Sequence, residues 1–295
     1  MKQVDASLYV GSNFLDVYWV LSKSRDLQLY DQKLVTFRDF LDKTQYTEDN
    51  VKAYEWIFGE NFISPGGAPE NLKILKKFKT LRPEIRMLDI GVGIGGGARQ
   101  VAREFGVHVL GCDLSSNMLV HALERNQRDK DHRVQYQICD ATIYKHDKNK
   151  FDVVFSRDCV QHISDLKKLF HIIYDVLKPG GEFLITLYGK GFGELKPKFL
   201  DYVNSRHYFL KNIKELDALA RTTGFEHVHT ENLTPRFKEI LFEERDKAVQ
   251  NKVDFIEKFG EELYKKTLVG WENKLQFIDD DNHNWLLIQG FKPKD

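Results

Sequence analysis

The chain has 295 residues, of which 42% are hydrophobic and 30% charged, a composition typical of a soluble globular protein and not of a disordered one. Lysine plus arginine and aspartate plus glutamate both number 44, so the zero net charge argues against a strongly basic nucleic-acid-binding protein. Three cysteines (Cys112, Cys139 and Cys159) exclude a disulfide scaffold and a CxxC metal site, and no apolar run is long enough to span a membrane.

The N-terminal part of the chain divides at about residue 35. Residues 1–35 form an extension to which we assign no role, and its apolar stretch 8–21 lacks the cleavage site of a signal peptide. Residues 36–62 predict a helix, a turn and a second helix, for which Thr47 is a suitable N-cap. The residues at 63–67 have the composition of a loop.

Residues 70–190 alternate between short apolar runs and amphipathic stretches, which predicts a doubly wound, mostly parallel sheet. The predicted helices are 70–79, 96–105, 116–127 and 165–177. The predicted strands are Arg86–Ile90, Val107–Cys112, Val134–Ile138, Phe151–Phe155 and Glu182–Leu187. After Tyr188 the alternation ends: 189–197 reads as a loop, 198–222 and 235–268 as helical, and 225–230 and 284–291 as strands.

A glycine-rich turn follows the first predicted strand, in the run MLDIGVGIGGG at 87–97. Glycines at 91, 93 and 95 permit a tight turn and close approach of a ligand. Asp89 precedes the turn, where its charge would repel the phosphates of a dinucleotide. S-adenosylmethionine carries an ammonium and a sulfonium but no phosphate, so an acid at this place favours that cofactor.

Two further acids end successive strands. Asp113 follows the second strand, where carboxylates accept hydrogen bonds from ribose hydroxyls, and Asp140 follows the third, near a position suited to an adenine amino group. The alternative is that each acid only caps the next helix. Open α/β sheets bind ligands at the carboxyl ends of their strands, and the coincidence of three acids there favours a cofactor site.

Residues 64–190 resemble the class I S-adenosylmethionine-dependent methyltransferases. The resemblance rests on the glycine loop, on Asp113 and Asp140, and on FDVVFS at 151–156 and LKPGG at 177–181. It implies a Rossmann-like α/β fold: a seven-stranded, mostly parallel sheet whose last strand is antiparallel, with a helical lid. We expect a methyltransferase domain at 36–295, its core at about 63–190 plus 223–234 and 284–295, and its lid at about 36–62 and 192–283.

Two polar groupings can contact the methyl acceptor. Asp158 and His162 follow the fourth strand and are four residues apart, which places both on one face of a helical turn. Tyr202 and Arg206 are spaced in the same way, and arginine presents a planar fork suited to phosphate or carboxylate. Alternatively, His162 begins a helix and Arg206 is a surface residue; Lys274 is by itself one of many lysines.

The stretch 44–67 resembles the opening segment of the phosphoethanolamine N-methyltransferases, which make phosphocholine from phosphoethanolamine and its monomethyl and dimethyl forms. Further motifs match this family in order: SRDCVQH at 156–162, ITLY at 185–188, YVNSRHY at 202–208 and GWENK at 270–274. The resemblance covers about 44–292. It is greatest to the domain that performs the later methylations, which would favour the monomethyl and dimethyl substrates.

The resemblance implies a role for each matching residue. Tyr46 and His162 would form a hydrogen-bonded catalytic pair, with His162 as the base. The phosphobase would be bound by Gln45, Tyr54, Ser64, Asp158, Tyr188, Tyr202, Arg206, Tyr208 and Lys274, with Arg206 and Lys274 on the phosphate and Asp158 facing the amine. S-adenosylmethionine would be bound by Ile63, Ser64, Asp89, Gly91, Gly93, Asp113, Leu114, Ser115, Asp140, Ala141 and Arg157.

We therefore expect a cytoplasmic, monomeric enzyme that N-methylates phosphobases for phosphatidylcholine synthesis, without a metal or a nucleic-acid partner. Two alternatives stay open at this point. A methyltransferase for another small molecule, such as a sterol or an amine, would keep the cofactor site but would not need the phosphate-binding cluster. A catalytically dead cofactor-binding module would keep the fold but would not turn over a phosphobase.

Overall fold

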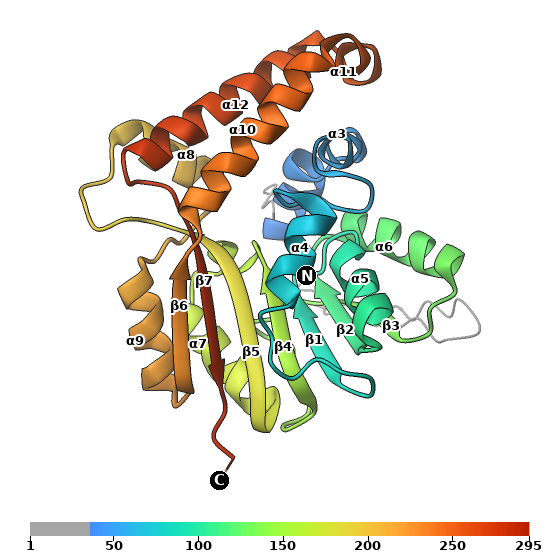
Figure 1. The fold of residues 1–295 in the computed structure, drawn as a ribbon, viewed down its shortest axis with the longest axis vertical. Coiled ribbons are helices and arrows are strands. Elements are labelled where there is room, and N and C mark those ends of the chain that lie inside the picture. Colours follow the sequence, from blue (N-terminus) through green and yellow to red (C-terminus); the bar gives the residue numbers. More distant parts are fainter. Residues whose placement is uncertain (1–35, 295) are drawn as a thin grey trace, which may run out of the picture.

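Seven strands form one mixed sheet in the order β3-β2-β1-β4-β5-β7-β6 (Figure 1). The computed structural model describes residues 36–294, so the predictions for the extension 1–35 lie outside the described residues. The strands are β1 (Arg86–Ile90), β2 (His108–Asp113), β3 (Val134–Ile138), β4 (Phe151–Arg157), β5 (Leu177–Gly189), β6 (Glu226–Asn232) and β7 (Asn284–Phe291). Strands β1 to β5 pair in parallel, whereas β7 is antiparallel to β5 and β6, which confirms the predicted fold class.

The sheet register brings the predicted acids to one edge. Leu88 pairs with Leu110 of β2, and Asp113 pairs with Ile138 of β3. The carboxyl ends of β1, β2 and β3 therefore lie side by side. Strand β5 is longer than predicted, because Phe151 pairs with Leu177 and the register then shifts before Val153 pairs with Glu182. This bulge admits the LKPGG segment into the strand.

Helices cover both faces of the sheet (Figure 1). One apolar core joins α4 (Gly67–Leu75), α5 (Gly96–Phe105) and α6 (Ser116–Asp129) to residues such as Met87 and Val109. The other joins α7 (Leu166–Val176) and α9 (Ile213–Thr223) to Leu88, Ile90 and Phe183. Alternate strand residues enter alternate cores, as the two-residue period of a strand requires.

The predicted lid 192–283 is wrong in one part. The helical stretch 198–222 is two helices, α8 (Pro197–Ser205) and α9, separated by the segment 206–212. Leu216 and Ala220 of α9 are fully buried in the core that α7 forms with the sheet. Apolar side chains at this spacing fit a helix on the sheet face, so α9 and the adjoining β6 belong to the core layer.

The remaining helices form a cap over the carboxyl edge of the sheet (Figure 1). This helical cap comprises α2 (Phe37–Phe40), the π-helical turn η1 (Leu41–Gln45), α3 (Glu48–Phe58), α8, α10 (Thr234–Gln250), α11 (Lys252–Phe259) and α12 (Glu261–Asp279). Thr47 caps α3 as predicted, accepting from the Asn50 backbone N–H. The helical stretch predicted at 235–268 is three helices, because the chain breaks at Asn251 and at Gly260, whose φ is +86°.

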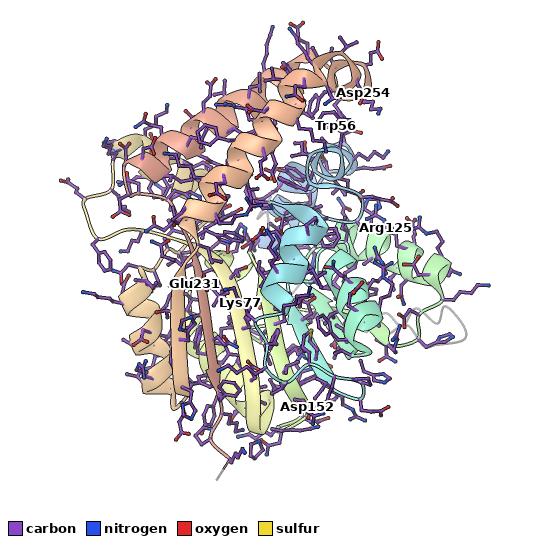
Figure 2. The ribbon with its side chains drawn as sticks, viewed as in Figure 1. Trp56, Lys77, Arg125, Asp152, Glu231 and Asp254 are labelled. Atoms are coloured by element: carbon purple, nitrogen blue, oxygen red, sulfur yellow. The ribbon has the colours of Figure 1, made fainter. Side chains whose placement is uncertain are left out.

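Trp56 joins the two sequence-distant parts of the helical cap. Its indole Nε1 donates to Asp254 at 2.7 Å, and its ring packs edge-on against Phe255 with centroids 5.0 Å apart. Figure 2 shows Trp56 of α3 and Asp254 of α11 close together. Lys247 of α10 donates to the Trp56 and Ile57 carbonyls at 2.6 and 3.0 Å. None of the described helices is long and apolar enough to cross a membrane.

Candidate active site

A cavity of about 990 Å³ lies between the carboxyl edge of the sheet and the helical cap. Every residue predicted above for catalysis, cofactor or substrate lines it, with the single exception of Ser115. The residues come from the glycine loop, from the ends of β2 to β5, from the cap segments 41–64 and from α8 and α12. The fold therefore gathers into one enclosure residues that are more than 200 positions apart in sequence.

The glycine loop is shaped by close approaches that exclude larger side chains. A Cβ on Gly91 would lie 2.2 Å from the Cys159 sulfur, so only glycine permits the turn after β4 to pack here. Gly93 has a φ of +55°, and its N–H donates to Asp113 Oδ2 at 2.9 Å. The loop and the end of β2 are thus held together through one carboxylate.

Asp89 is a buried carboxylate and Asp113 a partly buried one at this end of the cavity. Asp113 Oδ1 accepts from the Ser115 N–H at 2.8 Å, and burial raises the pKa of Asp113. Burial, with the charge of Asp113, raises the pKa of Asp89 to about 7. Two adjacent acids without a basic partner would repel phosphate and attract an ammonium. This donor set fits the ribose and methionine ends of S-adenosylmethionine, and the glycine cradle admits its close approach.

Ser115 and Arg157, both predicted to bind the cofactor, also make hydrogen bonds to other parts of the protein. The Ser115 hydroxyl accepts from the Met118 N–H and donates to Asp42 Oδ1 at 2.5 Å, so it caps α6 and does not face the cavity. The Arg157 guanidinium donates to the carbonyls of Pro65 and Gly67 at 2.5 and 3.3 Å. Arg157 therefore holds the 63–67 loop over the sheet edge, and Ser115 holds Asp113.

The turn after β4 is not the helical turn predicted for Asp158 and His162. Asp158 has a φ of +53°, a left-handed conformation uncommon outside glycine, and a 3₁₀ turn η2 (Val160–His162) follows. Gln161 Nε2 closes the turn by donating to the Asp158 carbonyl at 2.7 Å. Both Asp158 and His162 still line the cavity, but through this strained turn and not through an i, i+4 helix face.

Several buried polar atoms in the cavity wall lack a hydrogen-bond partner among the described residues, and most are acceptors. They are Gln45 Oε1, Asp158 Oδ2, Gln161 Oε1 and His162 Nδ1, with Arg157 Nε as the donor. Asp158 Oδ2 is only 3.7 Å from Arg157 Nε, while its Oδ1 accepts from Trp285 Nε1 and Thr186 Oγ1. Buried acceptors without donors are costly, so this wall is complementary to a ligand that donates hydrogen bonds.

His162 is a buried, neutral imidazole. Burial, with the positive charge of Arg206, lowers the pKa of His162 to about 4. Its ring packs against Tyr208 at 4.9 Å and Phe37 at 5.6 Å between centroids. The predicted hydrogen bond between His162 and Tyr46 is not among those of the described residues. The Tyr46 hydroxyl accepts from Gln45 Nε2 at 3.1 Å. Burial raises the pKa of Tyr46 above its ordinary value.

Arg206 is surrounded by phenol groups. Its guanidinium lies 5.8 Å from the centroid of the Tyr202 ring, which confirms that these two residues share a face. Burial opposes the charge of Arg206, but the phenols of Tyr202, Tyr208 and Tyr54 outweigh it and raise the Arg206 pKa. The Tyr208 ring contacts both the His162 ring and, at 5.9 Å, the Tyr202 ring. The Tyr208 ring therefore links the His162 imidazole to the Tyr202 ring, which lies next to Arg206.

Lys274 of α12 lines the same cavity, and near it lies a buried carboxylate, Glu244, that no sequence pattern singled out. Glu244 Oε1 accepts from the Gly66 N–H at 2.8 Å. Burial raises the pKa of Glu244 to about 7, and the charge of Lys274 acts the other way. Phe37, Gln161 and Asp42 were also not predicted. Phe37 packs on His162 and Asp42 accepts from Ser115, contacts between segments distant in sequence that no local spacing could identify.

The strand order, the glycine loop and the acids at the ends of β1, β2 and β3 define a class I S-adenosylmethionine-dependent methyltransferase. A family model described as a methyltransferase domain matches residues 87–181. Phosphoethanolamine N-methyltransferase 2 of Caenorhabditis elegans is 58% identical over 99% of this chain and 67% of its own length. The Plasmodium falciparum phosphoethanolamine N-methyltransferase is 33% identical over 86% of this chain and 96% of its own length.

The chain belongs to the phosphoethanolamine N-methyltransferase family. A solved structure of Haemonchus contortus phosphoethanolamine N-methyltransferase 2, in complex with phosphomonomethylethanolamine and S-adenosylhomocysteine, is 53% identical with a TM-score of 0.93. The match covers 99% of this chain and 68% of that one. The chain spans about half the length of plant relatives such as the Zea mays enzyme, to which it is 38% identical over 51% of the relative.

Proposed function

We propose that this chain transfers methyl groups from S-adenosylmethionine to the nitrogen of phosphobases, forming phosphocholine. The observation that carries the proposal is the distribution of charge in one cavity. Its wall holds buried acceptors that have no donor among the described residues, His162 Nδ1 included, and it also holds Lys274 and Arg206, the latter beside the phenols of Tyr202, Tyr208 and Tyr54. A phosphobase has the complementary ends, an amine and a phosphate joined by two carbons.

S-adenosylmethionine, when bound, supplies a methyl group on a sulfonium sulfur. In this proposal, Asp113 accepts hydrogen bonds from its ribose, Asp140 from its adenine amino group and Asp89 from its ammonium, and all three acids line the cavity. Gly91, Gly93, Leu114, Ala141, Ile63 and Ser64 complete the wall around it. In this proposal, Ser115 and Arg157 act indirectly: Ser115 orients Asp113 and Arg157 holds the loop that carries Ser64.

The reaction requires an amine with a free electron pair, so a protonated substrate must first lose a proton. His162 Nδ1 is buried, neutral and without a partner among the described residues, and it is the group we assign to accept that proton. Asp158 Oδ2 faces the positive charge of the amine. Arg206 and Lys274, with Tyr202, Tyr208, Tyr188 and Tyr54, bind the phosphate.

We also propose that the monomethyl and dimethyl substrates are preferred. Phe37 packs on His162, and its aromatic face suits a methylated cation better than it suits an ammonium that needs more hydrogen-bond acceptors. A single methyl contributes only about 1–3 kcal/mol to such discrimination. The phosphomonomethylethanolamine in the Haemonchus contortus structure accords with this preference.

The helical cap would act as a lid that excludes water from the reacting groups. Its residues and those of the sheet edge form the cavity within a single chain, which favours a monomer. Cys112, Cys139 and Cys159 are free thiols, which favours the cytoplasm.

The test is a turnover panel of phosphoethanolamine, its monomethyl form and its dimethyl form with S-adenosylmethionine, using the wild type, His162→Gln and His132→Gln. We expect turnover of the methylated forms at a higher kcat/KM than phosphoethanolamine. His162→Gln lowers kcat by about 100-fold or more because the proton acceptor is lost, with cofactor affinity unchanged. His132 is exposed and outside the cavity, so His132→Gln serves as the matched control.

Absence of turnover with all three phosphobases would leave a cofactor-binding module. Turnover of a sterol or a free amine in their place would support the other methyltransferase alternative. Equal kcat/KM for the three phosphobases would contradict the preference but not the reaction.

A further inference from the structure

The N-terminus of helix α6 is capped by a carboxylate from the helical cap, that of Asp42. Asp42, in the π-helical turn η1, accepts from the Ser115 hydroxyl at 2.5 Å and the Asn117 N–H at 3.4 Å through Oδ1. Its Oδ2 accepts from the Ser116 N–H at 3.3 Å and from the Ser116 hydroxyl. The first turn of α6 contains no acidic residue of its own. An acid at this end satisfies free N–H groups and interacts favourably with the helix dipole.

Asn117 makes the reciprocal half of this contact. Its Nδ2 donates to the carbonyls of Asp42 and Tyr46, both at 3.0 Å. The Tyr46 N–H in turn donates to the Leu41 carbonyl at 2.7 Å, which closes the π-helical turn. The segment 42–46 is therefore fixed at both ends by one asparagine on α6. Gln45 and Tyr46, which line the cavity, lie within it.

The same turn of chain holds Asp113. Ser115 donates its N–H to Asp113 Oδ1 and its hydroxyl to Asp42. Ser115 thus connects a carboxylate of the cofactor end to a carboxylate of the cap segment. Its side chain is fully buried, so water does not compete for these hydrogen bonds.

We infer that Asp42 and Asn117 are positioning residues that couple occupancy of the cofactor site at Asp113 to the placement of Gln45 and Tyr46 over the substrate. Neither residue is placed to contact the reacting atoms, since both act through the backbone of 42–46 and through Ser115. The role in placing Gln45 and Tyr46 over the substrate rests on the proposed function. The role in supporting the cofactor site at Asp113 does not depend on it.

The test uses Asp42→Asn, Asn117→Ala and the control Asp49→Asn. Asp49 is an exposed acid in the first turn of α3, a few residues from Asp42. Cofactor affinity is measured by calorimetry, first without and then with saturating phosphomonomethylethanolamine, and kcat and KM are measured with the same substrate. Circular dichroism establishes that each variant is folded.

We expect Asp42→Asn to weaken S-adenosylmethionine binding and to lower kcat, each by about tenfold, because hydrogen bonds to a charged group are lost. Asn117→Ala keeps the contacts of the Asp42 carboxylate and releases the backbone carbonyls of Asp42 and Tyr46. It should therefore lower kcat and reduce the gain in cofactor affinity that the substrate brings, with little effect on cofactor binding alone. Asp49→Asn should match the wild type.

A double-mutant cycle distinguishes positioning from simple stabilisation. If Asn117 acts through Tyr46, the kcat losses of Asn117→Ala and Tyr46→Phe are not additive. Additive losses, or an Asn117→Ala protein that keeps the wild-type coupling between substrate and cofactor, would overturn the inference. If the wild type turned over no phosphobase, the proposed function would fail, while the calorimetry of Asp42→Asn would still decide whether Asp42 supports the cofactor site.

Discussion

Asp89 illustrates at the residue scale how a binding group opposes the stability of the fold that holds it. The pKa of Asp89 is about 7, against about 4 for an unfolded aspartate, because burial and the charge of Asp113 disfavour its ionised form. The folded protein therefore holds a proton that the unfolded chain releases between these values. Stability from this group is present at low pH and is lost as the pH rises from about 4 to about 7.

We predict that Asp89→Asn stabilises the ligand-free protein at pH 8 by on the order of 2 kcal/mol, because a buried charge is removed, with a smaller effect at pH 5. The same change should weaken S-adenosylmethionine binding by about 100-fold. Thermal unfolding at both pH values and calorimetry measure the two effects. Asp147→Asn, an exposed acid whose ion pair is worth little, is the control; a destabilised Asp89→Asn at pH 8 would contradict the pKa assignment.

At the element scale, the sheet and its helices were predictable from the sequence, whereas parts of the helical cap were not. Buried parallel strands read as continuous apolar runs, so β1 and β3 were predicted at the bounds that the structure has. Between α8 and α9 the chain turns at His207, whose φ is +53°, and Tyr208 packs against His162, a contact across the fold that leaves no local pattern. The left-handed Asp158 was missed for the same reason.

The candidate site residues also divide into those that the sequence could predict and those whose role it could not. Nearly all the residues that the motif resemblance named line the cavity, because the order of the motifs along the chain is distinctive. The resemblance did not distinguish Ser115, which is absorbed into a helix cap, or Arg157, which mainly supports a loop through backbone carbonyls. Those roles depend on hydrogen bonds between segments up to 92 residues apart, which spacing does not encode.

A substitution of Trp56 tests whether the separate elements of the helical cap act together. Trp56 joins α3, which follows Tyr46, to α10 and α11, which precede Lys274 on α12. We predict that Trp56→Ala destabilises the protein by about 2–3 kcal/mol and raises the KM for phosphobase severalfold more than the Kd for cofactor. Chemical denaturation, steady-state kinetics and calorimetry measure these effects.

Trp56→Phe keeps the ring contact with Phe255 but not the hydrogen bond to Asp254, so it should lie between the wild type and Trp56→Ala. Lys52→Ala, which removes only an exposed ion pair on α3, is the control. An unchanged KM in Trp56→Ala would indicate that the two parts of the cap bind substrate independently.

On the scale of the whole molecule, the proposed function divides the site between two layers. The sheet edge carries the residues proposed to bind the cofactor and to accept the proton, and the cap carries the residues proposed to bind the phosphate. His162 follows β4, whereas Arg206 follows α8 and Lys274 lies on α12. The Tyr208 ring packs against both the His162 ring and the Tyr202 ring. Under the proposed function, neither layer recognises the phosphobase alone.

The most direct test compares phosphodimethylethanolamine with dimethylethanolamine, which lacks the phosphate, in the wild type, Arg206→Ala and the exposed control Arg82→Ala. We predict that the wild type and Arg82→Ala favour the phosphorylated amine by about 1000-fold in kcat/KM, and that Arg206→Ala loses most of this preference while its cofactor affinity is unchanged. Equal kcat/KM for the two amines in the wild type, or a preference that survives in Arg206→Ala, would contradict a cavity that binds the two ends of one phosphobase.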